Sequence, residues 1–148
     1  MQNQSVHGVV GHENSRRTDY LFRVSLKCLI RDDQGRLLVV KETGRDWWDL
    51  PGGGMDHGES IQDAIAREMY EEVGMRGAFT HDVVAVEEPR LLQRHSLWQM
   101  RVVFALQPEL MSFEAGTDGD EIAFMDAGKF ADSANHAERR VYEYSLLT

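Results

Sequence analysis

The chain has 148 residues, with 25 acidic and 16 basic side chains and a formal net charge of −9 at pH 7. This length is enough for one domain with a sizeable core, and a composition of 42% hydrophobic and 28% charged residues is that of an ordinary globular protein. The acidic balance makes a nucleic-acid partner unexpected, because there is no basic surplus to neutralise phosphates.

The first 19 residues are mostly polar. A segment with so few apolar side chains cannot bury enough surface to order itself, so we expect a flexible N-terminal arm over residues 1–19 and a single domain over 20–148. No secretory signal is recognisable at the start, and no apolar run approaches the roughly 20 residues that cross a membrane. We therefore expect a cytoplasmic protein with no membrane partner.

Two strands are predicted next, at Leu21–Ile30 and Arg36–Lys41. The short Asp/Gly turn between them indicates a β-hairpin. Cys28 lies in the first of these strands and is the single cysteine, which excludes an intramolecular disulfide bond and a cysteine-based zinc site. A short aromatic strand at Trp47–Leu50 ends at Pro51 and a run of glycines.

The clearest predicted helix begins after Ser60, which is suited to cap its N-terminus. Apolar residues recur there at helical spacing and form one face: Ile61, Ala64, Ile65, Met69 and Val73. Gly74 stands where a left-handed C-terminal cap is expected.

The remaining elements complete a mixed pattern. Strands are predicted at 77–80, 82–88, 97–106 and 121–125, a loop at 115–119, and a final helix at 133–147. Strands on both sides of a central helix, with another helix at the end, indicate an α/β or α+β sandwich.

The central helix carries an unusual set of charges. Six carboxylates lie between Gly53 and Met75, opposed only by Arg67: Asp56, Glu59, Asp63, Glu68, Glu71 and Glu72. Glu68, Glu71 and Glu72 stand at i, i+3 and i+4 and so project from one face, where like charges repel. Such a face is often only solvated surface, but the lack of compensating basic residues favours a site for a hard divalent cation.

The spacing of these residues resembles a known motif. Gly53, then Glu59 after five residues, then Arg67 to Met75 after seven more, fills every fixed position of the 23-residue Nudix box. The preceding Trp48–Gly53 segment is also similar to the family's usual entry into the box. The resemblance implies the Nudix fold, an α/β/α sandwich around a mixed sheet.

The resemblance also implies an activity. A Nudix enzyme hydrolyses a nucleoside diphosphate linked to another moiety, by attack of water on phosphorus with Mg²⁺, or Mn²⁺ in its place, as cofactor. By resemblance, Glu71 and Glu72 are metal ligands, Glu68 is a ligand or the general base, and the loop at Gly53 supplies a backbone oxygen. Glu59 and Arg67 are expected to pair and hold the glycine loop in place, the alternative being an ordinary surface salt bridge.

Further functional residues are expected outside the box. Relatives often recruit another carboxylate, for which Glu121 is the candidate, with Glu87 and Glu88 as alternatives. Substrate contacts are expected from Trp48, Arg90 and Arg94, because aromatic and guanidinium groups stack on bases and bind phosphates; an exposed connection without such a role is the alternative reading of the segment that holds the two arginines.

The substrate class is left partly open. A small nucleotide derivative, either a nucleoside triphosphate or a nucleotide sugar, is expected. RNA 5′-pyrophosphohydrolases are disfavoured, because they usually carry a Gln in the Pro-Gly-Gly segment, where this chain has none. A non-catalytic Nudix-fold module that binds nucleotides is the competing hypothesis, and relatives make a homodimer possible. Five of the nine excess negative charges lie in the box, so the acidity marks a place for cation-bridged phosphates rather than avoidance of them.

Overall fold

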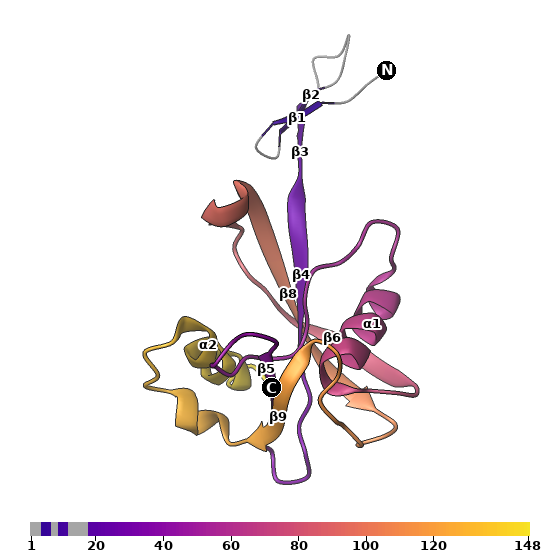
Figure 1. Cartoon of the computed structure of the whole chain (residues 1–148), viewed down its shortest axis with the longest axis vertical. Coiled ribbons are helices and arrows are strands. Elements are labelled where there is room, and N and C mark those ends of the chain that lie inside the picture. Colours follow the sequence, from indigo (N-terminus) through magenta and orange to yellow (C-terminus); the bar gives the residue numbers. More distant parts are fainter. Residues whose placement is uncertain (1–3, 7–8, 12–17) are drawn as a thin grey trace.

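The computed structural model describes residues 4–6, 9–11 and 18–148 (Figure 1). The strands in this part of the chain are β1 (Gln4–Val6), β2 (Val9–Gly11), β3 (Thr18–Tyr20), β4 (Phe22–Leu29), β5 (Leu37–Glu42), β6 (Phe79–Val86), β7 (Arg90–Leu92), β8 (Leu97–Pro108) and β9 (Gly119–Met125). The helices are α1 (Ile61–Val73) and α2 (His136–Ser145), with short 3₁₀ turns η1 (Gln93–His95) and η2 (Ala127–Phe130).

The strands that carry the core form a mixed arrangement. β4 runs parallel to β8, which also pairs antiparallel with β6 and β7, while β5 pairs antiparallel with β9. The predicted hairpin between β4 and β5 is wrong: these strands share a single bridge, Arg31 with Leu37, beyond the end of β4. The local turn forms as expected, but each strand takes its ladder partner from much later in the chain.

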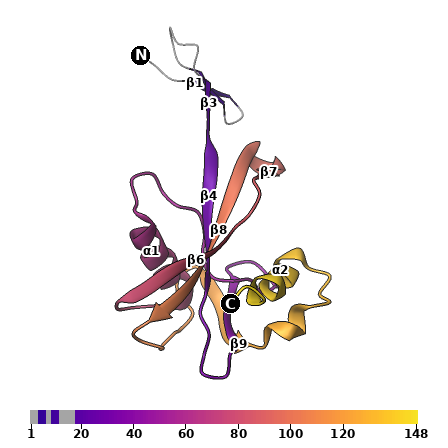
Figure 2. The ribbon, with the colours of Figure 1, turned by 180° about the vertical axis from the view of Figure 1, so that it is seen from behind.

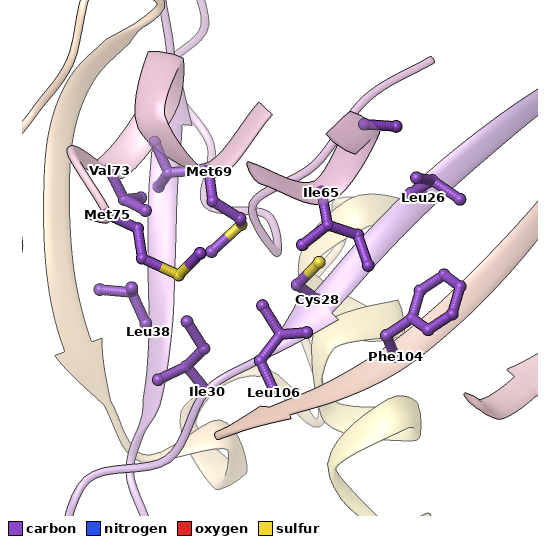
Figure 3. Packing of buried hydrophobic residues seen from close by; sticks show 12 residues of the cluster. Leu26, Cys28, Ile30, Leu38, Ile65, Met69, Val73, Met75, Phe104 and Leu106 are labelled. Atoms are coloured by element: carbon purple, nitrogen blue, oxygen red, sulfur yellow. The ribbon is translucent and has the colours of Figure 1, made fainter. Parts of the chain in front are cut away.

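The two helices lie on opposite sides of the strands, as Figure 2 shows. Side chains alternate between two buried clusters because successive strand residues point to opposite faces. Cys28 and Phe104 pack beneath α1 (Figure 3), whereas Leu29 and Val103 pack on the α2 side. This confirms the α+β sandwich predicted from the sequence, and it leaves α1 fixed along one face of the sheet.

Helix α1 begins and ends where the sequence predicts. The Ser60 hydroxyl accepts a hydrogen bond from the Asp63 N–H at 3.1 Å, and Gly74 closes the helix in the left-handed conformation at φ 67°. Four residues of the apolar face are fully buried, at about 1.5–3 kcal/mol for each large side chain: Ala64, Ile65, Met69 and Val73. Ile61 differs from the prediction, since it is 44% exposed at the first turn.

The other elements shift in their bounds. The predicted strands at 77–80 and 82–88 are one strand, β6, and the final helix is shorter than expected because Asn135 caps it and α2 begins only at His136. The expected Trp47–Leu50 strand is reduced to one bridge between Asp49 and Val40. None of the helices in the described residues is long and apolar enough to span a membrane.

The N-terminal segment, predicted to be a flexible arm over residues 1–19, contains strands where it is described, and its flexibility stays a prediction. Its described residues form a three-stranded antiparallel sheet, β1-β2-β3, at the far end of β4 (Figure 1). Backbone pairing of this kind satisfies N–H and C=O groups without apolar side chains. The rest of residues 1–19 lies outside the described part of the chain, and the boundary between residues 19 and 20 stays a prediction.

Candidate active site

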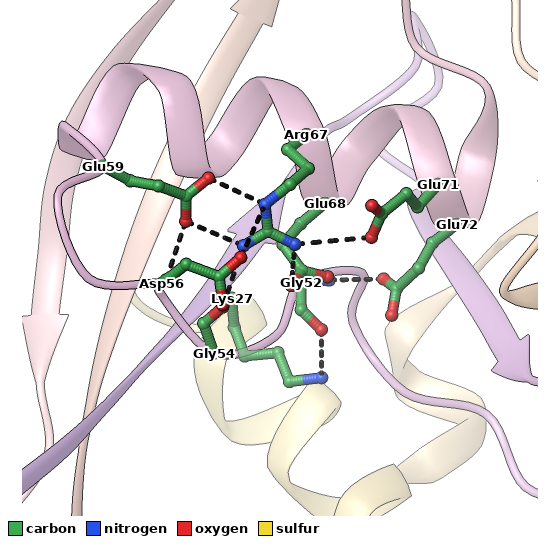
Figure 4. A network of polar contacts seen from close by, with 9 residues as sticks. All are labelled: Lys27, Gly52, Gly54, Asp56, Glu59, Arg67, Glu68, Glu71 and Glu72. Carbon is green, nitrogen blue, oxygen red and sulfur yellow. Dashed lines mark hydrogen bonds and ion pairs between the residues drawn. The ribbon is translucent and has the colours of Figure 1, made fainter.

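The site is centred on the contact between α1 and the glycine loop that precedes it. Glu72 is 4% exposed, and its Oε2 accepts a hydrogen bond from the Gly52 N–H at 2.6 Å (Figure 4). Gly52 has φ 134°, and a Cβ added there would lie 2.0 Å from the Leu26 carbonyl oxygen. Only glycine fits at this position, because any side chain would strike the backbone of β4.

A cleft of about 310 Å³ opens at this contact. It is lined by Arg23, Glu42, Thr43, Gly52, Gly53, Gly54, Glu68, Glu72 and Asp118. The fold therefore brings three of the predicted metal ligands, Gly53, Glu68 and Glu72, to one surface. Glu42, Asp118 and Arg23 join them from distant segments and were not predicted, since nothing in their local sequence marks them.

Arg67 organises the carboxylates beside this cleft (Figure 4). Its guanidinium donates to both oxygens of Glu59, at 2.7 and 2.8 Å, and to the Gly54 carbonyl oxygen at 3.0 Å. A third nitrogen, Nη1, lies 2.9 Å from Glu68 Oε1 and 3.4 Å from Glu71 Oε2. The two-pronged contact with Glu59 and the bond to the loop carbonyl fit the holding role predicted for this pair.

The ion pair between Glu59 and Arg67 should make the stability of the fold depend on pH. The Arg67 hydrogen bonds, with the Asp56 N–H, lower the pKa of Glu59 to about 2. Because the pKa of Glu59 is lower in the folded protein than its ordinary value of 4.5, ionised Glu59 stabilises the fold at pH values above 4.5. That stabilisation is lost as the pH falls towards 2. We expect Glu59→Gln to lower the unfolding temperature at pH 7, with the difference from the native protein narrowing between about pH 4.5 and 2.

Thermal unfolding across this pH range measures the effect of Glu59→Gln. The exposed Glu109 serves as a matched Glu→Gln control that leaves Arg67 untouched. A constant difference between native and Glu59→Gln proteins at all pH values would show that the ion pair does not contribute to stability.

The carboxylates in the cleft are partly shielded from water. Burial raises the pKa of Glu72 to about 8, outweighing the favourable field of Lys27 and the Gly52 hydrogen bond. Burial also raises the pKa of Glu68, although Arg67 opposes the shift. Buried carboxylates of this kind gain most from a nearby cation, because the cation removes the cost of ionising them.

The donors fit a hard divalent cation in kind, since all are oxygens. Among the described residues, however, no three His, Cys, Asp or Glu side chains are gathered closely enough to hold a metal ion as they stand. Glu68 and Glu71 are turned towards Arg67, and the Gly53 carbonyl oxygen accepts a hydrogen bond from the Leu26 N–H at 2.8 Å. A bound cation would have to share these oxygens with their present partners.

Asp118 reaches the cleft through a loop that caps the end of α1. The backbone N–H groups of Glu114, Gly116 and Asp118 donate to the carbonyl oxygens of Val73, Glu72 and Glu71, at 3.0, 3.1 and 2.9 Å. These are carbonyls that have no partner within the helix itself. The loop predicted at 115–119 thus completes the last turn of the helix that carries the carboxylates.

The chain is similar to known proteins in both sequence and fold. A family model described as NUDIX domain matches residues 21–144, which is most of the chain. The chain belongs to the Nudix family. Two solved structures share its fold: the MutT protein from Methanosarcina mazei Go1 (TM-score 0.68, 21% identity, 84% of this chain and 92% of that one) and a MutT NUDIX hydrolase from Burkholderia pseudomallei (TM-score 0.65, 21% identity, 82% and 95%).

Curated relatives match over a shorter stretch. A protein of Psychrobacter cryohalolentis named RNA pyrophosphohydrolase is 33% identical over 85 residues, covering 53% of this chain and 49% of that protein. One of the same name from Saccharophagus degradans is 46% identical over 55 residues, covering 36% and 32%. The matched segments thus span half or less of the length of these relatives.

The residues predicted to act from outside the box do not line the cleft. Glu121, on β9, has its Oε2 3.6 Å from Lys41 Nζ, its side chain is 60% exposed, and it does not line the cleft. Trp48 packs against the α2-side cluster, with Lys41 Nζ 4.9 Å from its ring centre. Arg90 and Arg94 are exposed on β7 and η1. Their roles stay predictions, and the cleft does not contain them.

Proposed function

We propose that this Nudix protein hydrolyses a pyrophosphate bond in a nucleotide-derived substrate, with Mg²⁺, or Mn²⁺ in its place, as cofactor. The observation that carries the proposal is the cleft itself: buried Glu72 and largely buried Glu68 face a glycine loop whose backbone approaches them closely. A polyanionic pyrophosphate can enter so acidic a site only with cations that bridge it to the carboxylates.

Three carboxylates of the box have roles in this proposal. Glu71 and Glu72 hold the cation, and Glu68 is either a further ligand or the base that takes the proton of the attacking water. The divalent cation, when bound, neutralises phosphate charge and makes the water more acidic. The P–O bond of the anhydride breaks, and the new P–O bond forms to the water oxygen, which leaves two phosphate-bearing products.

Arg23 supports the binding of phosphate. Its guanidinium lines the cleft, and a Cβ added to Gly54 would lie 2.4 Å from Arg23 Nη2, so the side chain lies directly over the loop. A guanidinium there is placed to pair with a phosphate oxygen of the substrate, because its planar fork matches phosphate geometry.

Two substrate classes compete. A nucleoside triphosphate or nucleotide sugar follows from the motif and the acidic charge, whereas the 5′-triphosphate end of RNA follows from the name of the curated relatives. The absence of a Gln in the Pro51–Gly54 segment favours the small nucleotide. The expected cytoplasmic location and homodimer stay predictions; light scattering on the purified chain measures the second.

A substrate panel tests the proposed function. Purified protein is incubated with nucleoside triphosphates, nucleotide sugars and a 5′-triphosphorylated oligoribonucleotide, with Mg²⁺ or with EDTA, and the phosphate products are quantified. We expect at least one small nucleotide to be hydrolysed with Mg²⁺, and we expect EDTA to abolish this hydrolysis. Turnover of the oligoribonucleotide alone would transfer the assignment to RNA ends, and binding of nucleotide with no turnover anywhere would favour the non-catalytic module.

A further inference from the structure

Lys27 places a positive charge directly beneath the glycine loop. Its side chain is 6% exposed in the middle of β4, between the buried Leu26 and Cys28. Burial by itself lowers the pKa of this ammonium, but Asp49, Glu72 and Glu42 outweigh it and raise the pKa, so the group is charged at neutral pH. A buried charge is costly unless its partners replace water, so packing alone does not explain a lysine here.

The ammonium joins three segments of the chain. Lys27 Nζ donates to the carbonyl oxygens of Leu50, at 3.0 Å, and Gly52, at 3.3 Å. It also lies 3.3 Å from Asp49 Oδ2 and 3.5 Å from Glu42 Oε1, while the other Glu42 oxygen pairs with a surface arginine. Lys27 therefore balances the carboxylates on one side of the cleft, as Arg67 does on the other.

Gly52 connects this ammonium to the metal-ligand candidate. Its carbonyl oxygen accepts from Lys27, and its N–H donates to Glu72 at 2.6 Å, so the two side chains hold one residue from opposite sides (Figure 4). Gly52 also lies against the backbone of β4, which leaves it little room to move.

We infer that the Lys27 ammonium takes the place of a divalent ion at one side of the site. It is the counter-charge of Glu42 and Asp49, and it positions Gly52 for its hydrogen bond to Glu72. The inference rests on the proposed function only in taking the cleft to bind divalent cations. Lys27 is a positioning residue, and it limits the divalent ions to the side of the cleft that holds Glu68 and Glu72.

Counting bound Mn²⁺ tests this inference without any substrate. Metal-free protein is titrated with Mn²⁺, and the free ion is measured by electron paramagnetic resonance. We expect Lys27→Met, which replaces the Lys stem up to Cε but lacks the charged ammonium, to bind one Mn²⁺ more per chain than the native protein. Lys27→Arg keeps the charge and should keep the native count. An unchanged count in Lys27→Met, or an extra ion in Lys27→Arg, overturns the inference.

A second variant covers the case in which Lys27→Met does not fold. Glu42 is partly exposed, so Glu42→Gln is expected to fold, and because Lys27 is the counter-ion of Glu42 the native Mn²⁺ count should be unchanged. A lower count would show that Glu42 ligates a divalent ion, which overturns the inference. Glu72→Gln is the positive control and should weaken Mn²⁺ binding at least tenfold.

The two proposals fail in different ways. If the counts shift as expected but no substrate is hydrolysed, the proposed function is wrong and Lys27 keeps its role. If Mg²⁺-dependent hydrolysis is found but Lys27→Met leaves the count unchanged, the inference about Lys27 is wrong and the proposed function stands.

Discussion

Replacing Glu72 by Gln is expected to lower kcat/KM by at least about 100-fold on the best substrate of the panel. The amide can still accept the hydrogen bond from Gly52, so the glycine loop keeps its anchor, but the negative charge that we propose holds the divalent cation is gone. Product release at saturating Mg²⁺ measures the effect. The exposed Glu109→Gln is the matched control and should retain native turnover.

Although Glu72→Gln should lower activity, it should raise the stability of the metal-free protein at high pH. Because burial raises the pKa of Glu72 from 4.5 to about 8, the metal-free fold binds this proton more tightly than the unfolded chain does. Stability is therefore lost as the pH rises from about 4.5 to about 8, at up to about 1.4 kcal/mol for each pH unit. Glu72→Gln has no such loss, so in EDTA at pH 8 it should unfold at a higher temperature than the native protein.

This pair of measurements separates a functional residue from a merely structural one. A Glu72→Gln protein that is both inactive and less stable at pH 8 would show that the carboxylate is held in a favourable environment. Retention of native turnover would remove Glu72 from the metal site altogether.

The second large effect is expected from Gly52→Ala. The added Cβ would lie 2.0 Å from the Leu26 carbonyl oxygen, and this atom belongs to the backbone of β4 and cannot rotate away. The loop or β4 must therefore shift, which we expect to cost about 3 kcal/mol or more of unfolding free energy. The shift also moves the N–H that binds Glu72, so Mn²⁺ affinity should fall together with stability.

Gly58 provides a matched control for this substitution. It lies in the same loop at φ 84°, but a Cβ added there meets no atom within 4 Å. Gly58→Ala should thus cost only the backbone strain of a positive φ, about 1–2 kcal/mol. Denaturant unfolding compares the two variants, and equal losses at both positions would show that the contact with β4 is not what requires glycine at position 52.

The central helix and its carboxylates were predictable because their information is local. The cap at Ser60, the apolar spacing and the stop at Gly74 lie within one short segment, and positions i, i+3 and i+4 share a face in any helix. The same holds for the pair of Glu59 and Arg67, because Glu59 directly precedes the cap of the helix and Arg67 lies two helical turns into that helix.

The ladder partners could not be read in the same way. A turn of Asp and Gly predicts a hairpin only if nothing better is available, and here β8 offers β4 a full-length parallel partner far along the chain. Periodicity says that a strand exists and which face is apolar, but it carries no record of which other strand will cover the edge.

The sequence by itself thus determined the family, the helix and the identity of the acidic residues, because each depends on short, fixed spacings. Only the tertiary structure decided what surrounds them. It brought Glu42, Asp118 and Arg23 into the cleft and left Glu121 beside Lys41 on β9. It also placed Lys27 beneath the glycine loop, where burial strengthens the interaction of its charge with the neighbouring carboxylates. No local pattern could reveal this, since burial is a property of the whole packed chain.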